Sequence, residues 1–145
     1  MADVYSTGYN QDNAVPPVNH PPTEGGGRIR IYKDTYLQGA ADGSIGDVIH
    51  MKKLPGGAKI LPGGLLSFGT GNTNETLQVG VTGADTKFLG VTAAATAGTA
   101  ALNAAHASGL DYDVPAAGIE VIVTNATAAI KAAQRVTVWI PYVID

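Results

Sequence analysis

Apolar and more polar residues alternate in two stretches near opposite ends of the region that follows residue 27. Near its start, Ile29 and Ile31 alternate with two arginines and Tyr32. Near its end, the segment 119–124 carries apolar side chains at every second position. A period of two is the pattern of a β-strand that buries one face, because successive side chains point to opposite sides. We therefore predict strands at both places, with the isoleucine side of the first strand buried.

The segment 136–144 is predicted to be a strand with two largely apolar faces. Its side chains form two sets: Val136, Val138, Ile140, Tyr142 and Ile144 on one side, and Thr137, Trp139, Pro141 and Val143 on the other. A strand with only one buried face alternates apolar and polar residues, so we expect both faces of this strand to contact protein. Pro141 has no backbone N–H to donate, which predicts a sheet edge or a bulge at this point.

Turn residues separate five shorter candidate strands between these stretches. The candidates are residues 45–51, 58–61, 65–69, 76–81 and 86–92. The tetrapeptide Leu-Pro-Gly-Gly occurs at 54–57 and again at 61–64, and Pro followed by Gly suits the central positions of a type II turn. About eight short strands with such turns predict an all-β sandwich or barrel. Within that class we expect a jelly-roll-like antiparallel β-sandwich.

The segment 91–109 is rich in alanine, threonine and glycine. Its alanine content suits a helix, yet its large apolar residues do not recur at the spacing of a helical face. We therefore predict extended or irregular structure here, with a short helix near 99–106 as the alternative.

The first 27 residues differ in composition from the rest of the chain, so we predict an extended N-terminal arm (1–27) ahead of a β-sandwich domain (28–145). The proline-rich stretch 14–22 favours polyproline II, and three glycines at 25–27 suit a hinge. The arm also carries apolar and aromatic residues that a solvated linker usually lacks, among them Tyr5, Tyr9, Val15 and Val18. Two interpretations remain open: a disordered tail, or an arm that becomes ordered on a neighbouring subunit.

Composition limits the partners of this chain. Its 145 residues suffice for one domain, and only 14% of them are charged, well below the roughly 25% of an average domain, so part of the surface is expected to be covered. The net charge of −3 argues against direct binding to nucleic acid, which needs clustered cations. The chain shows neither a secretory signal nor an apolar run of membrane-spanning length, so we expect no membrane partner and a cytoplasmic site of synthesis.

The residues that usually carry catalysis or bind metals are scattered. His20, His50 and His106 have no partner at ligand spacing, and cysteine is absent. Asp111 and Asp113 lack the glycine and the distal glutamate of a calcium loop. Neither a phosphate-binding loop nor a Gly-x-Ser-x-Gly elbow occurs in the sequence. We therefore predict a protein that is not an enzyme and has no cofactor or metal.

Tyrosine and tryptophan lie mostly in the arm or near strand ends. The simplest interpretation is ordinary packing at the ends of a sandwich. The alternative is that these residues anchor an interface, where Tyr and Trp are enriched. On that interpretation the candidate interface residues are Tyr5, Tyr9, Val15, Val18, Trp139 and Tyr142.

Three segments resemble parts of small structural proteins of tailed-bacteriophage particles, above all capsid decoration (cement) proteins. They are residues 46–60, where a strand leads through a turn to a short apolar strand, and residues 114–129 and 135–145 near the C-terminus. The likeness in strand and turn pattern covers roughly residues 28–145. It implies a jelly-roll domain on the outer surface of an icosahedral shell, often a homotrimer, that clamps neighbouring major capsid proteins. The protein is then assembled in the host cytoplasm and resides in the virion.

Two other functions fit the same predicted fold, since a fold does not determine a function. A tail- or fibre-associated binding module would recognise a host glycan through an exposed aromatic patch. A small sugar-active or cupin-like enzyme would need histidines or carboxylates converging inside the sandwich, where the alternating strands place mainly isoleucine and valine.

Overall fold

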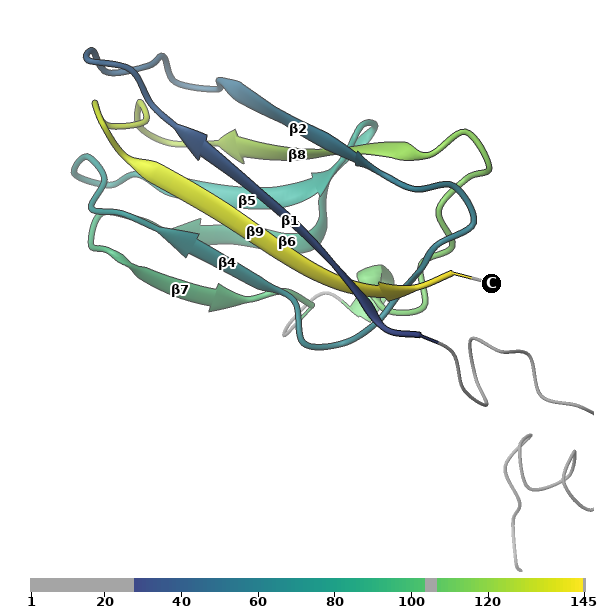
Figure 1. The fold of residues 1–145 in the computed structure, drawn as a ribbon. Helices are drawn as coiled ribbons and strands as arrows, with labels where there is room; N and C mark the ends of the chain where they lie inside the picture. The colour runs from purple at the N-terminus through teal and green to yellow at the C-terminus, as the bar shows by residue number, and fades with distance from the viewer. Residues whose placement is uncertain (1–27, 104–106, 145) are drawn as a thin grey trace, which may run out of the picture.

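The computed structural model describes residues 28–103 and 107–144. The predicted arm and its candidate interface residues Tyr5, Tyr9, Val15 and Val18 lie outside these ranges. The described residues form nine strands and one short 3₁₀ turn, arranged as two packed antiparallel sheets (Figure 1). The elements are β1 (Arg30–Leu37), β2 (Val48–Leu54), β3 (Lys59–Ile60), β4 (Leu65–Phe68), β5 (Thr76–Val81), β6 (Ala84–Ala93), β7 (Gly98–Ala101), η1 (Ala107–Gly109), β8 (Ile119–Asn125) and β9 (Arg135–Val143).

The strand order confirms the predicted jelly-roll sandwich. One sheet, called here the β9 sheet, has the order β1-β9-β4-β7, and β3 pairs with the end of β9. The other, the β8 sheet, has the order β2-β8-β5-β6. Strands therefore pair from the two ends of the domain inwards, β1 with β9, β2 with β8, β4 with β7 and β5 with β6. This nested pairing of eight strands in two sheets is the jelly roll, to which β3 is an addition.

All five shorter candidate strands are present, with shifted bounds in most cases. The prediction for 76–81 matches β5, whereas β2 lies three residues further along than 45–51. In the second Leu-Pro-Gly-Gly segment the left-handed residue is Gly63 (φ 101°), as a type II turn requires. In the first segment it is Gly57 (φ 76°) and not Gly56, so the turn is displaced by one residue from the prediction.

The core lies between the inner faces of the two sheets. Side chains at alternate positions of the strands are fully buried there, including Leu66 in β4, Leu77 and Val79 in β5, and Val121 and Val123 in β8. Phe88 of β6 is also fully buried and contacts Tyr112 edge to face, with ring centroids 6.2 Å apart. Burial of this apolar surface is the main force that holds the two sheets together.

Pro141 predicted a sheet edge or a bulge, but β9 lies inside its sheet, and its register with β1 runs through Pro141 without a shift. Strand β9 pairs with β1 on one side and with β4 and β3 on the other. Proline is tolerated because the second partner is interrupted beside it: Leu65 of β4 pairs with Trp139, and β3 resumes the pairing at Tyr142. The missing N–H of Pro141 therefore removes no ladder hydrogen bond.

The predicted orientation of the first strand is wrong. Ile29 and Ile31 are 64% and 67% exposed, whereas Tyr32 is 3% exposed and belongs to the core. Tyr32 pairs with the buried Ile140 of β9, so it must point to the same inner side. The pairing with β9 thus decides the orientation, and it places the isoleucines on the outer face.

The described part of the segment 91–109 is extended or irregular up to residue 103, as predicted. Strand β6 continues to Ala93, and Gly98–Ala101 form β7 at the edge of the β9 sheet. Residues 99–101, which the alternative placed in a short helix, lie in this strand, and residues 104–106 lie outside the described ranges. A single 3₁₀ turn, η1, follows.

Candidate interaction surface

The outer face of the β9 sheet presents apolar side chains in register across four strands. Lys33, Trp139, Leu65 and Ala101 form one row that runs across β1, β9, β4 and β7. The adjacent row begins with the pair Ile31 and Pro141. Residues directly opposite each other in neighbouring strands lie close enough for their side chains to touch. The register therefore gathers this apolar material into a continuous patch.

We call this surface the Trp139 face and define it by the outward positions of its strands. They are Ile31, Lys33, Thr35 and Leu37 of β1; Lys59 of β3; Leu65 and Ser67 of β4; Thr99 and Ala101 of β7; and Arg135, Thr137, Trp139, Pro141 and Val143 of β9. Thr137 and Val143 are buried beneath their neighbours. Ile31 and Leu37 are 67% and 56% exposed. Ile31 lies in the row next to that of Trp139, whereas Leu37 pairs with Arg135 on the far side of Thr35 and Thr137. Exposed large apolar side chains on one face mark a candidate contact surface.

Trp139 lies in the middle of this face. The ring is half-buried, and the Lys33 ammonium lies 5.6 Å from its centroid. A cation over an exposed aromatic face contributes only about 0.5–1 kcal/mol, so Lys33 holds the ring loosely. Trp139 is thus available to a partner. Tyr142, the other predicted interface residue in the described ranges, instead packs against the core on the inner side of the sheet.

The charged residues of the Trp139 face all have the same sign. Lys33 and Arg135 are exposed and Lys59 is half-buried, and none of the defining residues is an aspartate or glutamate. One exposed carboxylate, Asp113, lies at the margin of the face, where it pairs with Lys59. A row of hydroxyl side chains separates Arg135 from Trp139: Thr35, Thr137, Ser67 and Thr99. Thr35 and Thr137 share a hydrogen bond of 3.0 Å between their Oγ1 atoms. The face is therefore apolar, basic and hydroxylated, on a protein whose net charge is negative.

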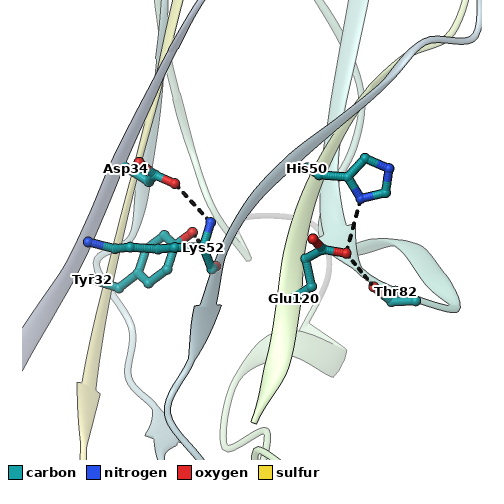
Figure 2. A network of polar contacts seen from close by, with 6 residues as sticks. All are labelled: Tyr32, Asp34, His50, Lys52, Thr82 and Glu120. Atoms are coloured by element: carbon teal, nitrogen blue, oxygen red, sulfur yellow. Dashed lines mark hydrogen bonds and ion pairs between the residues drawn. The ribbon is translucent and has the colours of Figure 1, made fainter.

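The outer face of the β8 sheet has a different character. His50 of β2 and Glu120 of β8 share a hydrogen bond with 3.0 Å between Nδ1 and Oε2, and Thr82 donates to the same oxygen (Figure 2). The hydrogen bond with His50 is the main reason that the pKa of Glu120 lies below its usual value. The histidine that showed no ligand partner in the sequence thus has a carboxylate partner 70 residues away, which no local pattern could reveal.

One side of the sandwich, between β1 and β2, is closed by side chains. Asp34 accepts a hydrogen bond from the Lys52 amide at 2.8 Å, and the Tyr32 hydroxyl donates to the Lys52 carbonyl at 2.8 Å (Figure 2). Burial, followed by the nearby charges of Asp34 and Glu120, raises the pKa of Tyr32 far above its ordinary value. Tyr32 is therefore a neutral hydrogen-bond donor that ties the two sheets together.

A shallow pocket lies where β1 and β2 diverge beyond this contact. It has a volume of about 190 Å³ and is lined by Tyr36, Gln38, Asp47, Val48, Ile49, His50 and Ile130. The pocket lining contains one carboxylate, that of Asp47, and one imidazole, that of His50. Within residues 28–103 and 107–144, no three His, Cys, Asp or Glu side chains gather as metal ligands would. The Trp139 face is therefore a stronger candidate for a functional site than this pocket.

The chain has the fold of proteins found in bacteriophage capsids. It is similar to a chain of the cyanophage Pam1 capsid asymmetric unit, with a TM-score of 0.68 and 22% identity, over 97% of this chain and 100% of that one. It is also similar to a chain of the Ralstonia phage GP4 capsid, with a TM-score of 0.70 and 18% identity, over 82% and 86% of the two chains. At these identities the likeness establishes the shared fold.

Comparison at the level of sequence gives no further relative: no protein-family model and no curated protein matches the chain. In the part of the chain that the structure describes, no helix has the length and apolar character of a membrane span.

Proposed function

We propose that this protein is a structural component of a bacteriophage particle that binds the outer surface of the capsid. In this role it stabilises the shell by holding neighbouring major capsid proteins together, and it acts as a homotrimer. The protein is assembled in the host cytoplasm and stays with the virion.

The observation that carries this proposal is the Trp139 face. A jelly roll buries the inner faces of its two sheets and needs no apolar residues outside, yet Ile31, Leu37 and Trp139 gather on one outer face. An exposed patch of this kind is covered by another protein in the functional assembly. The same fold occurs in chains of two phage capsids, which supports an assembly of that class.

A structural role on a shell also accounts for the composition. Many identical copies on a symmetric surface bind at several points, so each contact can be weak while the whole attachment is strong. Such a protein needs broad contact surfaces and no converging titratable groups. Exposed apolar side chains on the outer face of the β9 sheet support such a contact surface. Within the described residues no three His, Cys, Asp or Glu side chains gather as metal ligands would.

Co-sedimentation with shells tests the proposal. The full-length protein is mixed with empty shells of the major capsid protein from the same genome, and bound protein is measured at increasing concentration. We expect binding that saturates at a fixed number of copies per capsid subunit, together with a higher temperature of shell disassembly. A protein that neither sediments with the shells nor changes their disassembly temperature contradicts the proposed function.

A matched pair of variants tests the role of the face. Trp139→Ser removes the central ring, and Val91→Ser removes a 60% exposed apolar side chain from β6 in the other sheet. A tryptophan at the centre of an interface typically contributes about 2 kcal/mol or more, which corresponds to roughly thirty-fold in Kd. We expect a loss of this size for Trp139→Ser and little change for Val91→Ser. Binding of glycans by the unchanged protein, without shell binding, would favour a tail or fibre module instead.

A further inference from the structure

The net negative charge of this protein comes from its first 27 residues. All nine Lys and Arg residues lie from Arg28 onward, and three of the twelve acidic residues, Asp3, Asp12 and Glu24, precede Arg28. The segment 28–145 therefore has nine charges of each sign and no net charge, whereas residues 1–27 carry the whole net charge of −3. The arm is thus acidic, and it also holds the apolar and aromatic residues noted above.

The Trp139 face is complementary to this segment in both respects. Its defining residues include three cations and no carboxylate, and Trp139, Ile31 and Leu37 offer apolar area. The outer face of the β8 sheet carries Glu120 paired with His50 and lacks this one-sided charge. Opposite charges around an apolar centre favour one partner over others and speed its association. Among the surfaces that the structure describes, the Trp139 face suits the acidic arm best.

Charge also argues against the same face of a second copy as the occupant. A two-fold contact between two Trp139 faces would bring Lys33 and Arg135 of both copies to one interface with no carboxylate among the face's defining residues to balance them. Like charges that face each other across an interface are unfavourable by several kcal/mol.

The length of the arm favours a neighbouring copy over its own domain. Strand β9 has nine residues and spans about 30 Å. Tyr5 and Tyr9 precede Arg28 by about twenty residues, a reach of roughly 65 Å when the chain is extended. The proline-rich sequence 14–22 lies between these tyrosines and the domain and favours an extended chain. A fully extended arm would therefore carry these tyrosines past the face of its own domain, because its reach is about twice the length of β9.

We propose that the Trp139 face binds the acidic N-terminal segment, residues 1–27, of another copy of this chain. The basic residues attract Asp3 and Asp12, and the apolar rows around Trp139 receive the tyrosines and valines of the arm. This inference rests on the proposed function, because it identifies the partner at the face on which that function depends. It makes exchange of arms the contact that holds the copies of the assembly together.

Charge reversal in the full-length chain tests the electrostatic part. The face variant carries Lys33→Glu and Arg135→Glu, and the arm variant carries Asp3→Lys and Asp12→Lys. Self-association is measured by sedimentation equilibrium at low and high salt. Each variant alone should associate at least about ten-fold more weakly, and a chain that carries all four substitutions should recover wild-type association, because every arm then again meets a face of opposite charge. The wild-type association should also weaken as salt rises.

Surface charge alone must not produce the same result, so a control variant carries Lys53→Glu and Lys131→Glu, both exposed and outside the Trp139 face. We expect it to associate as the wild type does. Equal weakening in the control, or failure of the four-fold variant to recover, overturns the proposal.

Disulfide trapping tests whether the arm crosses to another copy. The chain contains no cysteine, so every disulfide joins two introduced cysteines. Peptide mapping identifies the joined positions, and the single variants Asn10→Cys and Ser67→Cys control for bonds between equivalent positions of two copies. Asn10→Cys is combined with Ser67→Cys on the Trp139 face, and the control combines it with Gln78→Cys on the outer face of the β8 sheet. Oxidation should give covalent dimers and larger species with Ser67→Cys and only single chains with Gln78→Cys. A disulfide within one chain, or no disulfide with Ser67→Cys, overturns the proposal.

These measurements use the isolated protein without shells, so their outcome is independent of capsid binding. Arm exchange without shell binding would leave this inference standing and contradict the proposed function. Shell binding without a disulfide between copies would support the proposed function and contradict this inference.

Discussion

The carboxylate of Asp34 accepts a hydrogen bond from the backbone amide of Lys52, and this bond joins edge strands of two different sheets. Lys52 lies where the register of β2 against β8 shifts, between His50 and Lys53. A strand at such an irregularity leaves ladder groups unpaired, and an edge with unpaired amides invites association with other chains. The hydrogen bond to Asp34 satisfies one of these amides and so makes the edge of β2 less able to pair with a strand of another chain.

Replacement of Asp34 by alanine should destabilise the fold by about 1 kcal/mol, because the Lys52 amide loses a charged acceptor in a site that water can still reach. Asp34→Asn is the matched control, since its side-chain oxygen can still accept the bond. Urea unfolding at a fixed protein concentration measures both variants. Equal stability of Asp34→Ala and the wild type would show that the bond makes no net contribution.

The Tyr32 hydroxyl predicts a dependence of stability on alkaline pH. Its pKa is raised in the folded protein, so ionisation above pH 10 occurs more readily in the unfolded chain. The resulting stabilisation is fully present below pH 10 and is lost as pH rises further. Tyr32→Phe lacks this group, and it also lacks the bond to the Lys52 carbonyl, which contributes about 1 kcal/mol at neutral pH.

We therefore expect Tyr32→Phe to be less stable than the wild type at pH 7 and the difference to shrink between pH 10 and pH 11. Denaturant unfolding across this range measures the difference. A constant difference at every pH would contradict a raised pKa for Tyr32.

The sequence predicted the positions of the strands well because the period of two is a local property. The orientation of β1 was not predictable, since both of its alternating sets contain large apolar side chains. Tyr32 and the two isoleucines compete for the inner side, and the pairing of Tyr32 with Ile140 of β9 decides between them. That pairing joins residues far apart in the chain, and the local pattern carries no signal for it.

The same limit applies to the candidate surface. The alternation in 136–144 correctly separated Trp139 from the buried set of Val136, Val138 and Ile140. The row that Trp139 forms with Lys33 and Leu65 depends on the registers of β1 and β4 against β9. The one-sided charge of the face follows from these registers. Sequence alone therefore identified the central residue and missed the surface around it.

A loop contact predicts loss of stability in acid. Asp42 accepts hydrogen bonds from the Ala132 amide at 2.8 Å and from the Asn72 side-chain amide at 2.9 Å. These bonds, with the Ala132 amide first, hold the pKa of Asp42 below its ordinary value of 3.8. Stabilisation by this group is present above that ordinary value and is lost as pH falls through the lower pKa of the folded state.

Asp42→Asn should lower Tm at pH 7, because its single side-chain oxygen can accept only one of the two bonds and the favourable charge is gone. The gap in Tm to the wild type should close as pH falls below about 4, where the wild-type carboxylate becomes protonated. Thermal unfolding followed by circular dichroism at pH 7 and pH 2.5 measures the gap. A gap of the same size at both pH values would show that the charge of Asp42 is not what stabilises the loop.

A close approach of two backbones predicts that Gly80 does not tolerate a side chain. Gly80 lies in β5 opposite Ile122 of β8, and a Cβ at this position would lie 2.0 Å from the Ala84 carbonyl oxygen and 2.4 Å from the Asp85 carbonyl carbon. Both are backbone atoms of β6, which crowds β5 where the register of the two strands shifts. Relief of the clash requires that β6 move as a unit, so Gly80→Ala should destabilise the fold by about 1–3 kcal/mol.

Gly39→Ala is the matched control for this prediction. A Cβ at Gly39 meets no atom within 4 Å, and its backbone is not in the left-handed region. The control should leave stability unchanged or raise it by about 0.5 kcal/mol, because alanine restricts the unfolded chain. Urea unfolding of the two variants separates a local clash from the general effect of replacing glycine. If Gly80→Ala proves as stable as Gly39→Ala, then β6 yields without cost and the close approach does not constrain the β8 sheet.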